Sequence, residues 1–167
     1  TTIDLDPGAV AAQTLADLRC RFGERFVVEA EVPNRWTIDG IDAEPAAALY
    51  DYQVVAYEAE HRRVQIQLVR PLTTDQPLRL KVRAHRTPTF PLTADDLRPV
   101  QFAEATYARR LVAIAPGSNY RLELSGDSRL DREDPSRLSS ADAARITPRA
   151  GGVVFEDDER ARALRVD

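Results

Sequence analysis

The sequence predicts a mainly β protein: an antiparallel β-sandwich, or an open barrel, of roughly eight to ten strands with one N-terminal amphipathic helix. Three observations predict it. Apolar and polar residues alternate with a period of two over several short stretches. Turn-forming Pro, Gly, Asn and Asp residues separate these stretches. Near the N-terminus, apolar residues instead follow a helical spacing, so we expect helix at about 7–22 and sheet at about 25–166, in a single domain 1–167.

The helix is predicted from its boundaries as well as its spacing. Asp6 is placed as the N-cap, Pro7 as the first helical residue and Gly23 as the C-terminal stop. The apolar face between them consists of Val10, Ala11, Leu15, Leu18 and Phe22. The segment therefore reads as an amphipathic helix at an edge of the sheet.

A half-buried strand follows over 26–32 and ends at Pro33-Asn34. Trp36 and Ile38 begin a return strand before Asp39-Gly40, and residues 44–49 suggest a short helical turn.

Strands over 50–58 and 63–70 are joined by a tight connection, and Pro71 ends the second strand. The segment 78–85 alternates perfectly between apolar and basic residues, so a hairpin of 63–70 with 78–85 is expected. Its register sets Leu68 opposite Leu80, Ile66 opposite Val82 and Val64 opposite Ala84. The apolar faces of the two strands then coincide.

A proline-rich connection is expected over 86–99, with a helical turn at 93–97. Strands are expected over 107–115 and 119–125. A capped turn at 140–142 and a last hairpin of 153–156 with 160–166 complete the chain.

The basic face of the 78–85 strand is the first candidate binding site. Arg79, Lys81 and Arg83 alternate with the apolar residues, and the expected register sets Gln67 opposite Lys81 and Gln65 opposite Arg83. Cations and amides on one sheet face suit an anionic glycan or an acidic protein partner. The alternative is a solvated face whose cations are neutralised by acids elsewhere in the chain.

The acidic stretch 127–134 is a weak calcium candidate. Carboxylates on a loop supply part of the oxygen set that calcium prefers, and here they are Asp127, Asp131, Glu133 and Asp134. Arg129 and Arg132 interrupt the series, and the central glycine of an EF-hand is missing, so internal ion pairing is the alternative. With one cysteine and two histidines, no other metal site and no cofactor are expected.

No catalytic residue is predicted. The sequence has no Gly-x-Ser-x-Gly elbow and no His-Glu-x-x-His motif. Glycoside hydrolysis needs two convergent carboxyls, which the sequence alone does not identify, although Asp95, Asp96, Glu104, Glu123 and Glu156 are available. Trp36 could stack on a sugar, but core packing is the expected role, and Cys20 is expected to be a small buried residue.

Net charge and composition limit the classes of partner that we expect this chain to bind. The net charge of −4 and pI of about 5.3 argue against a general nucleic-acid binder. No apolar run approaches the roughly 18 residues of a membrane-spanning segment, so no membrane insertion by this segment is expected. The 167 residues contain no Met, and Lys81 is the only lysine, which suggests a piece of a longer chain from a GC-rich bacterial genome.

These observations together favour a non-catalytic structural, recognition or adhesion module of a larger bacterial secreted or cell-envelope protein. One alternative is a carbohydrate-active enzyme or its accessory sugar-binding domain. The other is a cytoplasmic interaction or sensory domain, which the single cysteine and the resulting lack of an internal disulfide mildly favour.

Overall fold

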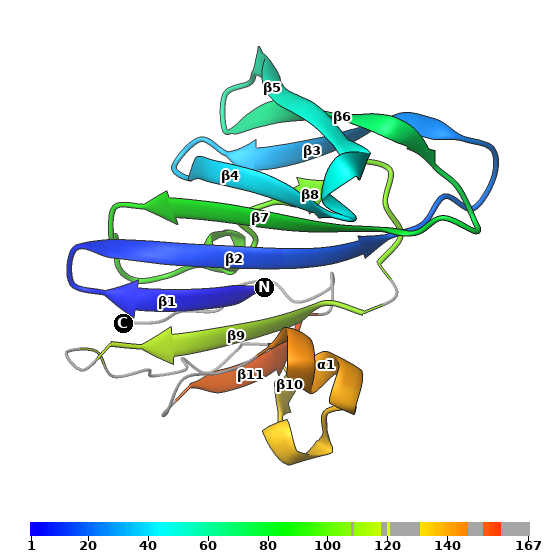
Figure 1. Cartoon of the computed structure of the whole chain (residues 1–167). Coiled ribbons are helices and arrows are strands. Elements are labelled where there is room, and N and C mark those ends of the chain that lie inside the picture. The colour runs from blue at the N-terminus through cyan, green and yellow to red at the C-terminus, as the bar shows by residue number, and fades with distance from the viewer. Residues whose placement is uncertain (108, 118–119, 121–130, 147–151, 158–167) are drawn as a thin grey trace. The chain divides into compact units, whose positions relative to one another are not determined.

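A computed structural model describes residues 1–107, 109–117, 120, 131–146 and 152–157 of the chain (Figure 1). Its first seven strands are β1 (Thr2–Asp6), β2 (Ala9–Leu18), β3 (Arg25–Pro33), β4 (Thr37–Glu44), β5 (Leu49–Tyr57), β6 (His61–Leu72) and β7 (Leu78–Arg86). Four further strands are β8 (Gln101–Phe102), β9 (Leu111–Pro116), β10 (Asp131–Glu133) and β11 (Val153–Glu156). The helical elements are the 3-10 turns η1 (Ala46–Ala48), η2 (Ala94–Leu97) and η3 (Pro135–Arg137) and the helix α1 (Ser140–Arg145).

The described strands form two sheets and no closed barrel, which confirms a mainly β protein. The strand orders are β10-β11-β9-β1-β2-β7-β4 and β5-β6-β3-β8. By its contacts the chain divides into two compact units. The first unit comprises residues 1–13, 85–98 and 106–167, and the second comprises 14–84 and 99–105.

The predicted N-terminal helix is wrong, because the segment forms the strand β2. Asp6 pairs with Ala9 across the Pro7-Gly8 dipeptide, so the supposed helix start is the two-residue turn of an antiparallel β1–β2 hairpin. Val10, Ala12 and Thr14 are buried in alternation, as in a strand. Residues 9–12, Ala-Val-Ala-Ala, are all apolar and fit a helical period as well as a strand period, so pairing within the sheet decides between the two. The described chain contains one short α-helix instead, α1.

One pairing departs from the predicted antiparallel arrangement, because β1 runs parallel to β9. Thr2 aligns with Ala113 and Leu5 with Pro116. At the end of this pair the Gly117 amide donates a hydrogen bond to the Leu5 carbonyl at 2.7 Å. A Cβ at Gly117 would collide with that same carbonyl oxygen, so the close approach of the two strands requires glycine here.

The predicted hairpin of β6 with β7 is wrong as well. β6 lies between β5 and β3, whereas β7 lies between β2 and β4 in the other sheet. Both strands do bury the predicted apolar residues, including Ile66 and Leu80. The alternation correctly fixed which side of each strand is buried, but it does not identify the neighbouring strand. The residues 73–77 therefore connect two sheets rather than closing a hairpin.

Several other elements agree with the sequence. The strand ending at Pro33, the β5–β6 hairpin, and the turns η1 and η2 lie where they were expected. The return strand β4 is present, but it continues through Asp39-Gly40, and its neighbour is β7. The strand expected at 107–115 begins only at Leu111. The strands expected at 119–125 and 160–166 lie outside the described residues.

Each unit has its own buried apolar residues. In the first unit Ile3, Leu5, Ile114, Val154 and Phe155 are almost completely buried. In the second unit the largest are Trp36, Ile66 and Leu80. Full burial of each such side chain contributes about 1.5–3 kcal/mol, so these residues dominate the stability of the two units.

Candidate functional site

Arg79, Lys81 and Arg83 of β7 lie on the face that the sequence predicted. Leu78, Leu80, Val82 and Ala84 are buried, and the intervening residues are partly or fully exposed. We call the outward side chains Arg79, Lys81 and Arg83, together with the acids that contact them, the charged face of β7. It belongs to the second unit.

Acidic residues of the neighbouring strands pair with these arginines. Arg79 donates from Nε to Asp17 Oδ1 at 2.7 Å and from Nη1 to Glu44 Oε2 at 3.0 Å. Arg83 Nη2 lies 3.3 Å from Asp42 Oδ2. The hydrogen bond to Asp17, followed by its charge, raises the pKa of Arg79. Exposed pairs of this kind contribute about 0–1 kcal/mol each, so their main effect is to cancel charge.

Gly40 on β4 makes room for one of these arginines. A Cβ at Gly40 would lie 2.9 Å from Arg83 Nη2. The guanidinium therefore lies across the strand at the one residue without a side chain, close to Asp42.

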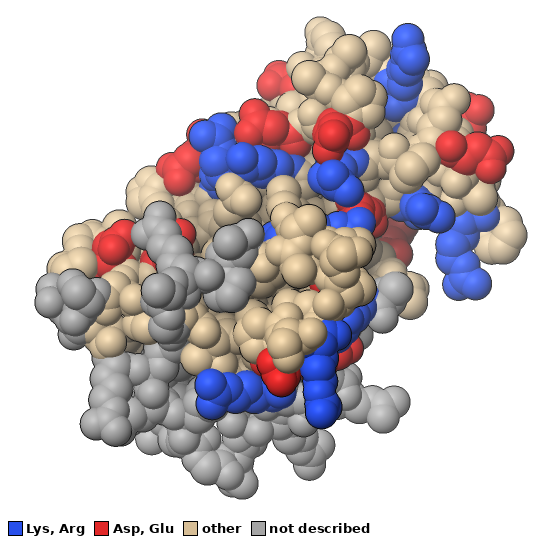
Figure 2. All heavy atoms as spheres, turned by 60° about the horizontal axis from the view of Figure 1, so that its bottom comes forward, with Lys and Arg blue, Asp and Glu red and all other residues tan. Residues whose placement is uncertain are grey.

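The amides that were expected to join this face lie elsewhere. Gln65 and Gln67 are on β6, where they pair with Glu29 and Val27 of β3 and with Gln53 and Asp51 of β5. The register that set them opposite Arg83 and Lys81 is therefore wrong. Figure 2 shows basic and acidic side chains lying next to one another on the face in view. Binding of an anionic glycan or an acidic protein stays a prediction, and the paired acids favour the solvated-face alternative.

The calcium candidates do not converge in the part of the chain that the structure describes. Asp127 lies outside the described residues, and Asp131 is placed only by the backbone of β10. Asp134 caps η3, where its Oδ1 accepts from the Ser136 amide at 2.9 Å and from the Ser136 hydroxyl at 2.8 Å. These hydrogen bonds, first the one from the backbone amide, lower the pKa of Asp134.

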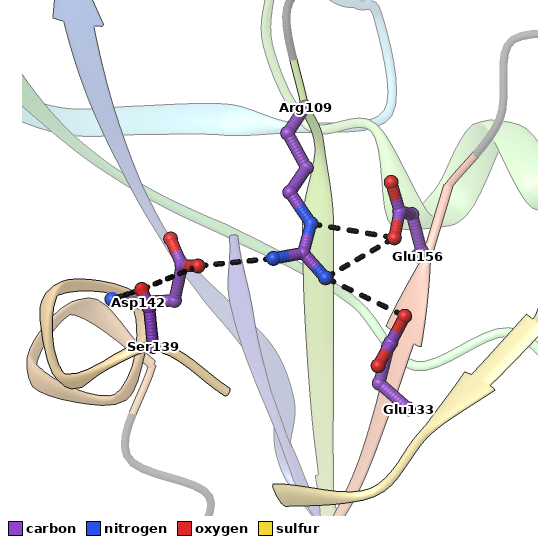
Figure 3. A network of polar contacts seen from close by, with 5 residues as sticks. All are labelled: Arg109, Glu133, Ser139, Asp142 and Glu156. Atoms are coloured by element: carbon purple, nitrogen blue, oxygen red, sulfur yellow. Dashed lines mark hydrogen bonds and ion pairs between the residues drawn. The ribbon is translucent and has the colours of Figure 1, made fainter. Parts of the chain in front are cut away.

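Glu133 contacts an arginine, as the ion-pairing alternative anticipated. Arg109, just before β9, lies at the centre of three carboxylates (Figure 3). Its Nη2 is 3.4 Å from Glu133 Oε1 and 3.2 Å from Glu156 Oε2, and its Nη1 donates to Asp142 Oδ2 at 3.0 Å. The hydrogen bond to Glu156 is the largest cause that raises the pKa of Arg109.

This Arg109 cluster joins three elements of the first unit. Glu133 lies on β10, Glu156 on β11 and Asp142 in the first turn of α1. Ser139 caps α1: its Oγ donates to Asp142 Oδ2 at 2.8 Å and accepts from the Asp142 amide at 3.1 Å. The guanidinium thus occupies the position where three acids would otherwise repel one another. Sequence reasoning missed Arg109, because its partners are 24 to 47 residues away and share no pattern with it.

A second arginine cluster is buried in the same unit. Asp157 accepts from Arg98 Nε at 2.9 Å and from Arg98 Nη2 at 2.7 Å, and Arg110 Nη1 donates to it at 3.3 Å. The Arg110 guanidinium also stacks over the Tyr107 ring at 3.9 Å from its centroid. Only 4% of the Asp157 side chain is exposed. Charge-assisted hydrogen bonds in such a position are strong and fix the geometry of the segments that they join.

Arg86 and Asp96 form a further buried pair. Their side chains are 3% and 4% exposed, with Nη2 and Oδ1 at 3.2 Å. Asp96 also accepts from the amide and the hydroxyl of Thr93 at the start of η2. Asp96 was one of the carboxylates available for glycoside hydrolysis, and here it holds the proline-rich connection to the end of β7.

The two remaining candidate residues, Trp36 and Cys20, differ in burial. Trp36 is fully buried, which confirms its expected place in the core. Cys20 is only partly buried, in the loop after β2. Within the described residues, no group of three or more His, Cys, Asp or Glu side chains is placed to hold a metal ion. The helices that the structure describes include none long and apolar enough to cross a membrane.

Comparison with known proteins reveals a likeness in fold. No family model matches the sequence, and no curated protein matches it. One similar solved structure is a two-domain M1 zinc metallopeptidase mutant bound to L-tryptophan, with a TM-score of 0.54 and 10% identity. Another is an M1 zinc metallopeptidase mutant from Deinococcus radiodurans bound to a Tyr-Ser-Ala substrate, with a TM-score of 0.51 and 11% identity. Both alignments cover 99% of this chain but 40% of the solved chain, and at this identity they show the fold alone.

Proposed function

We propose that this chain is a non-catalytic β-domain of a larger protein, in which it serves as a structural or recognition module beside a catalytic domain. The observation that carries the proposal is the unequal coverage of the alignments. Nearly the whole chain, 99%, matches a 40% portion of a two-domain metallopeptidase. A chain that resembles one part of a longer enzyme is well explained as the corresponding part of a longer protein, by analogy of fold. We place that protein in a bacterium, as the arginine-rich composition suggests, and within it in the envelope or the medium.

The use of charged side chains supports a structural role. Arg79, Arg98 and Arg109 each contact carboxylates of strands or turns distant in sequence. Such pairs fix elements relative to one another within a unit, and they leave those acids and bases engaged within the chain. This is the arrangement expected of a rigid support rather than of a reactive site, where acids and bases are poised for substrate.

The size of the native protein tests this proposal. Source cells are fractionated and immunoblotted with an antibody raised against this chain. We expect a band well above 18.6 kDa in the envelope or medium fraction. A cytoplasmic band near 18.6 kDa would overturn the proposal, because the chain would then be a complete small protein.

Catalysis is tested on the isolated chain. Aminoacyl and peptide substrates are incubated with it in the presence of zinc, and a panel of polysaccharides is incubated separately. We expect hydrolysis no faster than in buffer. Peptide hydrolysis would contradict the non-catalytic reading, and glycan hydrolysis would favour the carbohydrate-active alternative.

A further inference from the structure

The strand β5 forms an open edge of the four-stranded sheet in the second unit (Figure 1). Its one neighbour among the strands that the structure describes is β6, so the backbone groups on its other side have no strand to pair with. Tyr50 and Tyr57 are 73% and 76% exposed, and Val54 and Val55 are 39% and 44% exposed. Tyrosine and valine favour strands, so this edge is a template onto which a further strand could be added.

The ends of β5 are protected from such pairing, but its middle is not. Two shifts of register against β6, between Leu49 and Asp51 and between Val54 and Ala56, interrupt the ends of the strand. Irregularities of this kind bend a strand and disrupt its ladder of hydrogen bonds. They leave a regular segment, 51–54, that pairs residue by residue with 64–67 of β6. Proline and lysine, two common protections of an edge, are absent from β5.

Asp51 is the only charged residue of β5 and lies at the start of this regular segment. Its Oδ1 accepts a hydrogen bond from the Tyr52 amide at 2.8 Å. The carboxylate thus satisfies a backbone group of the strand without the help of a second strand. A strand that bonded to this amide would first have to displace the carboxylate. Asp51 is exposed, so its charge is hydrated as long as the edge stays open.

We propose that Asp51 guards the β5 edge and prevents two copies of this chain from joining through it. A second copy is the strand to be excluded, because it presents the same apolar edge, and two identical edges can pair antiparallel about a twofold axis. The inference goes beyond the proposed function and does not depend on it.

The cost of such pairing comes from the carboxylate. If the two regular segments paired with each other, Asp51 would lie opposite Val54 of the second copy, with the Cβ atoms about 5 Å apart. The carboxylate would lose water and its bond with the Tyr52 amide, and it would gain no cation, because β5 contains none. The other residues of the segment are neutral, so Asp51 alone supplies this cost.

Asp51→Val tests the proposal, because it removes the charge and the acceptor and supplies a residue that favours strands. We expect the unaltered chain to sediment as a monomer of 18.6 kDa and the variant to form dimers at least about tenfold more tightly. Analytical ultracentrifugation over a range of concentrations measures this association. Amide hydrogen exchange locates it, because residues 49–57 should exchange more slowly in the dimer than in the dilute monomer.

The matched control is Glu31→Val on β3. It removes the same charge and adds the same side chain at an exposed position, but β3 is paired there on both sides, with β6 and with β8. The backbone has no open edge at this residue, so the variant should stay monomeric. Asp51→Val combined with Gln53→Lys should also be monomeric, because a lysine within the regular segment restores a charge that pairing would desolvate.

Trp36 fluorescence separates edge pairing from unfolding, because Trp36 is fully buried in the same unit. Its emission should be the same in all of these variants. If Asp51→Val disturbs it, Asp51→Asn takes its place, with Glu31→Gln as its control.

The proposal would be overturned if the folded Asp51 variant stayed monomeric, or if the Glu31 control associated as tightly. Slowed exchange that lay outside residues 49–57 would overturn it as well. So would an unaltered chain that already forms dimers through β5, because Asp51 would then not prevent them.

Discussion

At the scale of one residue, Asp157 illustrates that the contribution of a charged side chain to stability depends on both its burial and its partners. Two arginines, Arg98 and Arg110, donate to a carboxylate that is almost fully buried. Removing the negative charge would leave two guanidinium groups in a poorly solvated place, and that penalty exceeds the value of the pair itself. Nothing in the sequence distinguishes this aspartate from Asp158 beside it. Its importance arises only from the segments that the fold brings to it.

We expect Asp157→Asn to lower the free energy of unfolding by about 3–5 kcal/mol, the cost of breaking a buried ion pair. Guanidinium chloride denaturation followed by circular dichroism measures the change. The matched control is Glu104→Gln, whose partner Arg25 lies 3.4 Å away with both side chains largely exposed. It should change stability by less than about 1 kcal/mol. Equal effects of the two substitutions would contradict the burial argument.

Asp134 gives a pH-dependent prediction. Its folded pKa is lowered by the Ser136 amide and hydroxyl, so the η3 cap is complete above the unfolded pKa and is lost as the pH falls through the folded value. Titration of the Asp134 carboxyl by NMR should have a midpoint below the usual 3.8. Ser136→Ala keeps the amide, the larger cause, and should raise the midpoint only part of the way. A midpoint at or above 3.8 in the unaltered chain would exclude the cap.

At the scale of elements, sequence patterns predicted which side of a strand is buried better than which strand lies beside it. The alternation in β6 and β7 correctly identified Ile66 and Leu80 as buried, yet the two strands are in different sheets. Burial is a property of one strand, whereas pairing depends on loops and on the whole topology. The wrong prediction of an N-terminal helix has a related cause. Asp6-Pro7-Gly8 fits both a helix start and a hairpin turn, and pairing of β2 with β1 decided the outcome.

The candidate sites show the same difference between features that depend on one strand and features that depend on the whole topology. The outward placement of Arg79, Lys81 and Arg83 could be predicted, because it depends on a single strand. Their acidic partners could not, because β2 and β4 reach β7 only through the folded topology. The acids of the Arg109 cluster lie on β10, β11 and α1. No pattern within a single segment of the sequence therefore indicates this cluster.

The Arg109 cluster predicts a local effect on α1. We expect Arg109→Gln to speed amide hydrogen exchange of residues 140–145 by about fivefold, because a six-residue helix loses its tie to Asp142. Exchange is measured by mass spectrometry of the corresponding peptides. Arg63→Gln removes an exposed pair with Glu58 in the β5–β6 hairpin and serves as the control. Unchanged exchange of α1 in the Arg109 variant would show that the ion pairs do not hold the helix.

The charged face of β7 predicts weak binding to polyanions. With Asp17, Glu44 and Asp42 beside the arginines, we expect elution from heparin at or below about 150 mM salt, and no change on combining Arg79→Glu with Arg83→Glu. Replacing the three acids by their amides should instead delay elution, because the cations would then be uncompensated. Strong retention that the double charge reversal abolishes would contradict this and support glycan binding.

At the scale of the whole molecule, the two compact units share continuous strands. Residues 9–13 of β2 belong to the first unit and 14–18 to the second, and β7 contributes 78–84 to the second and 85–86 to the first. Because the backbone of each of these strands passes directly from one unit into the other, unfolding of one unit frees one end of a strand in the other. We therefore expect the chain to unfold as one domain, as the sequence predicts.

Trp36 makes this testable, because it is the only tryptophan and is fully buried in the second unit. Asp157→Asn, which lies in the first unit, should shift the Trp36 fluorescence transition and the circular dichroism transition to the same lower denaturant concentration. Val64→Ala, in the core of the second unit, should also shift both together. If Asp157→Asn lowers the circular dichroism midpoint while Trp36 keeps its original midpoint, the two units unfold independently. The single-domain prediction would then be wrong, and each unit would have to be treated as a domain of its own.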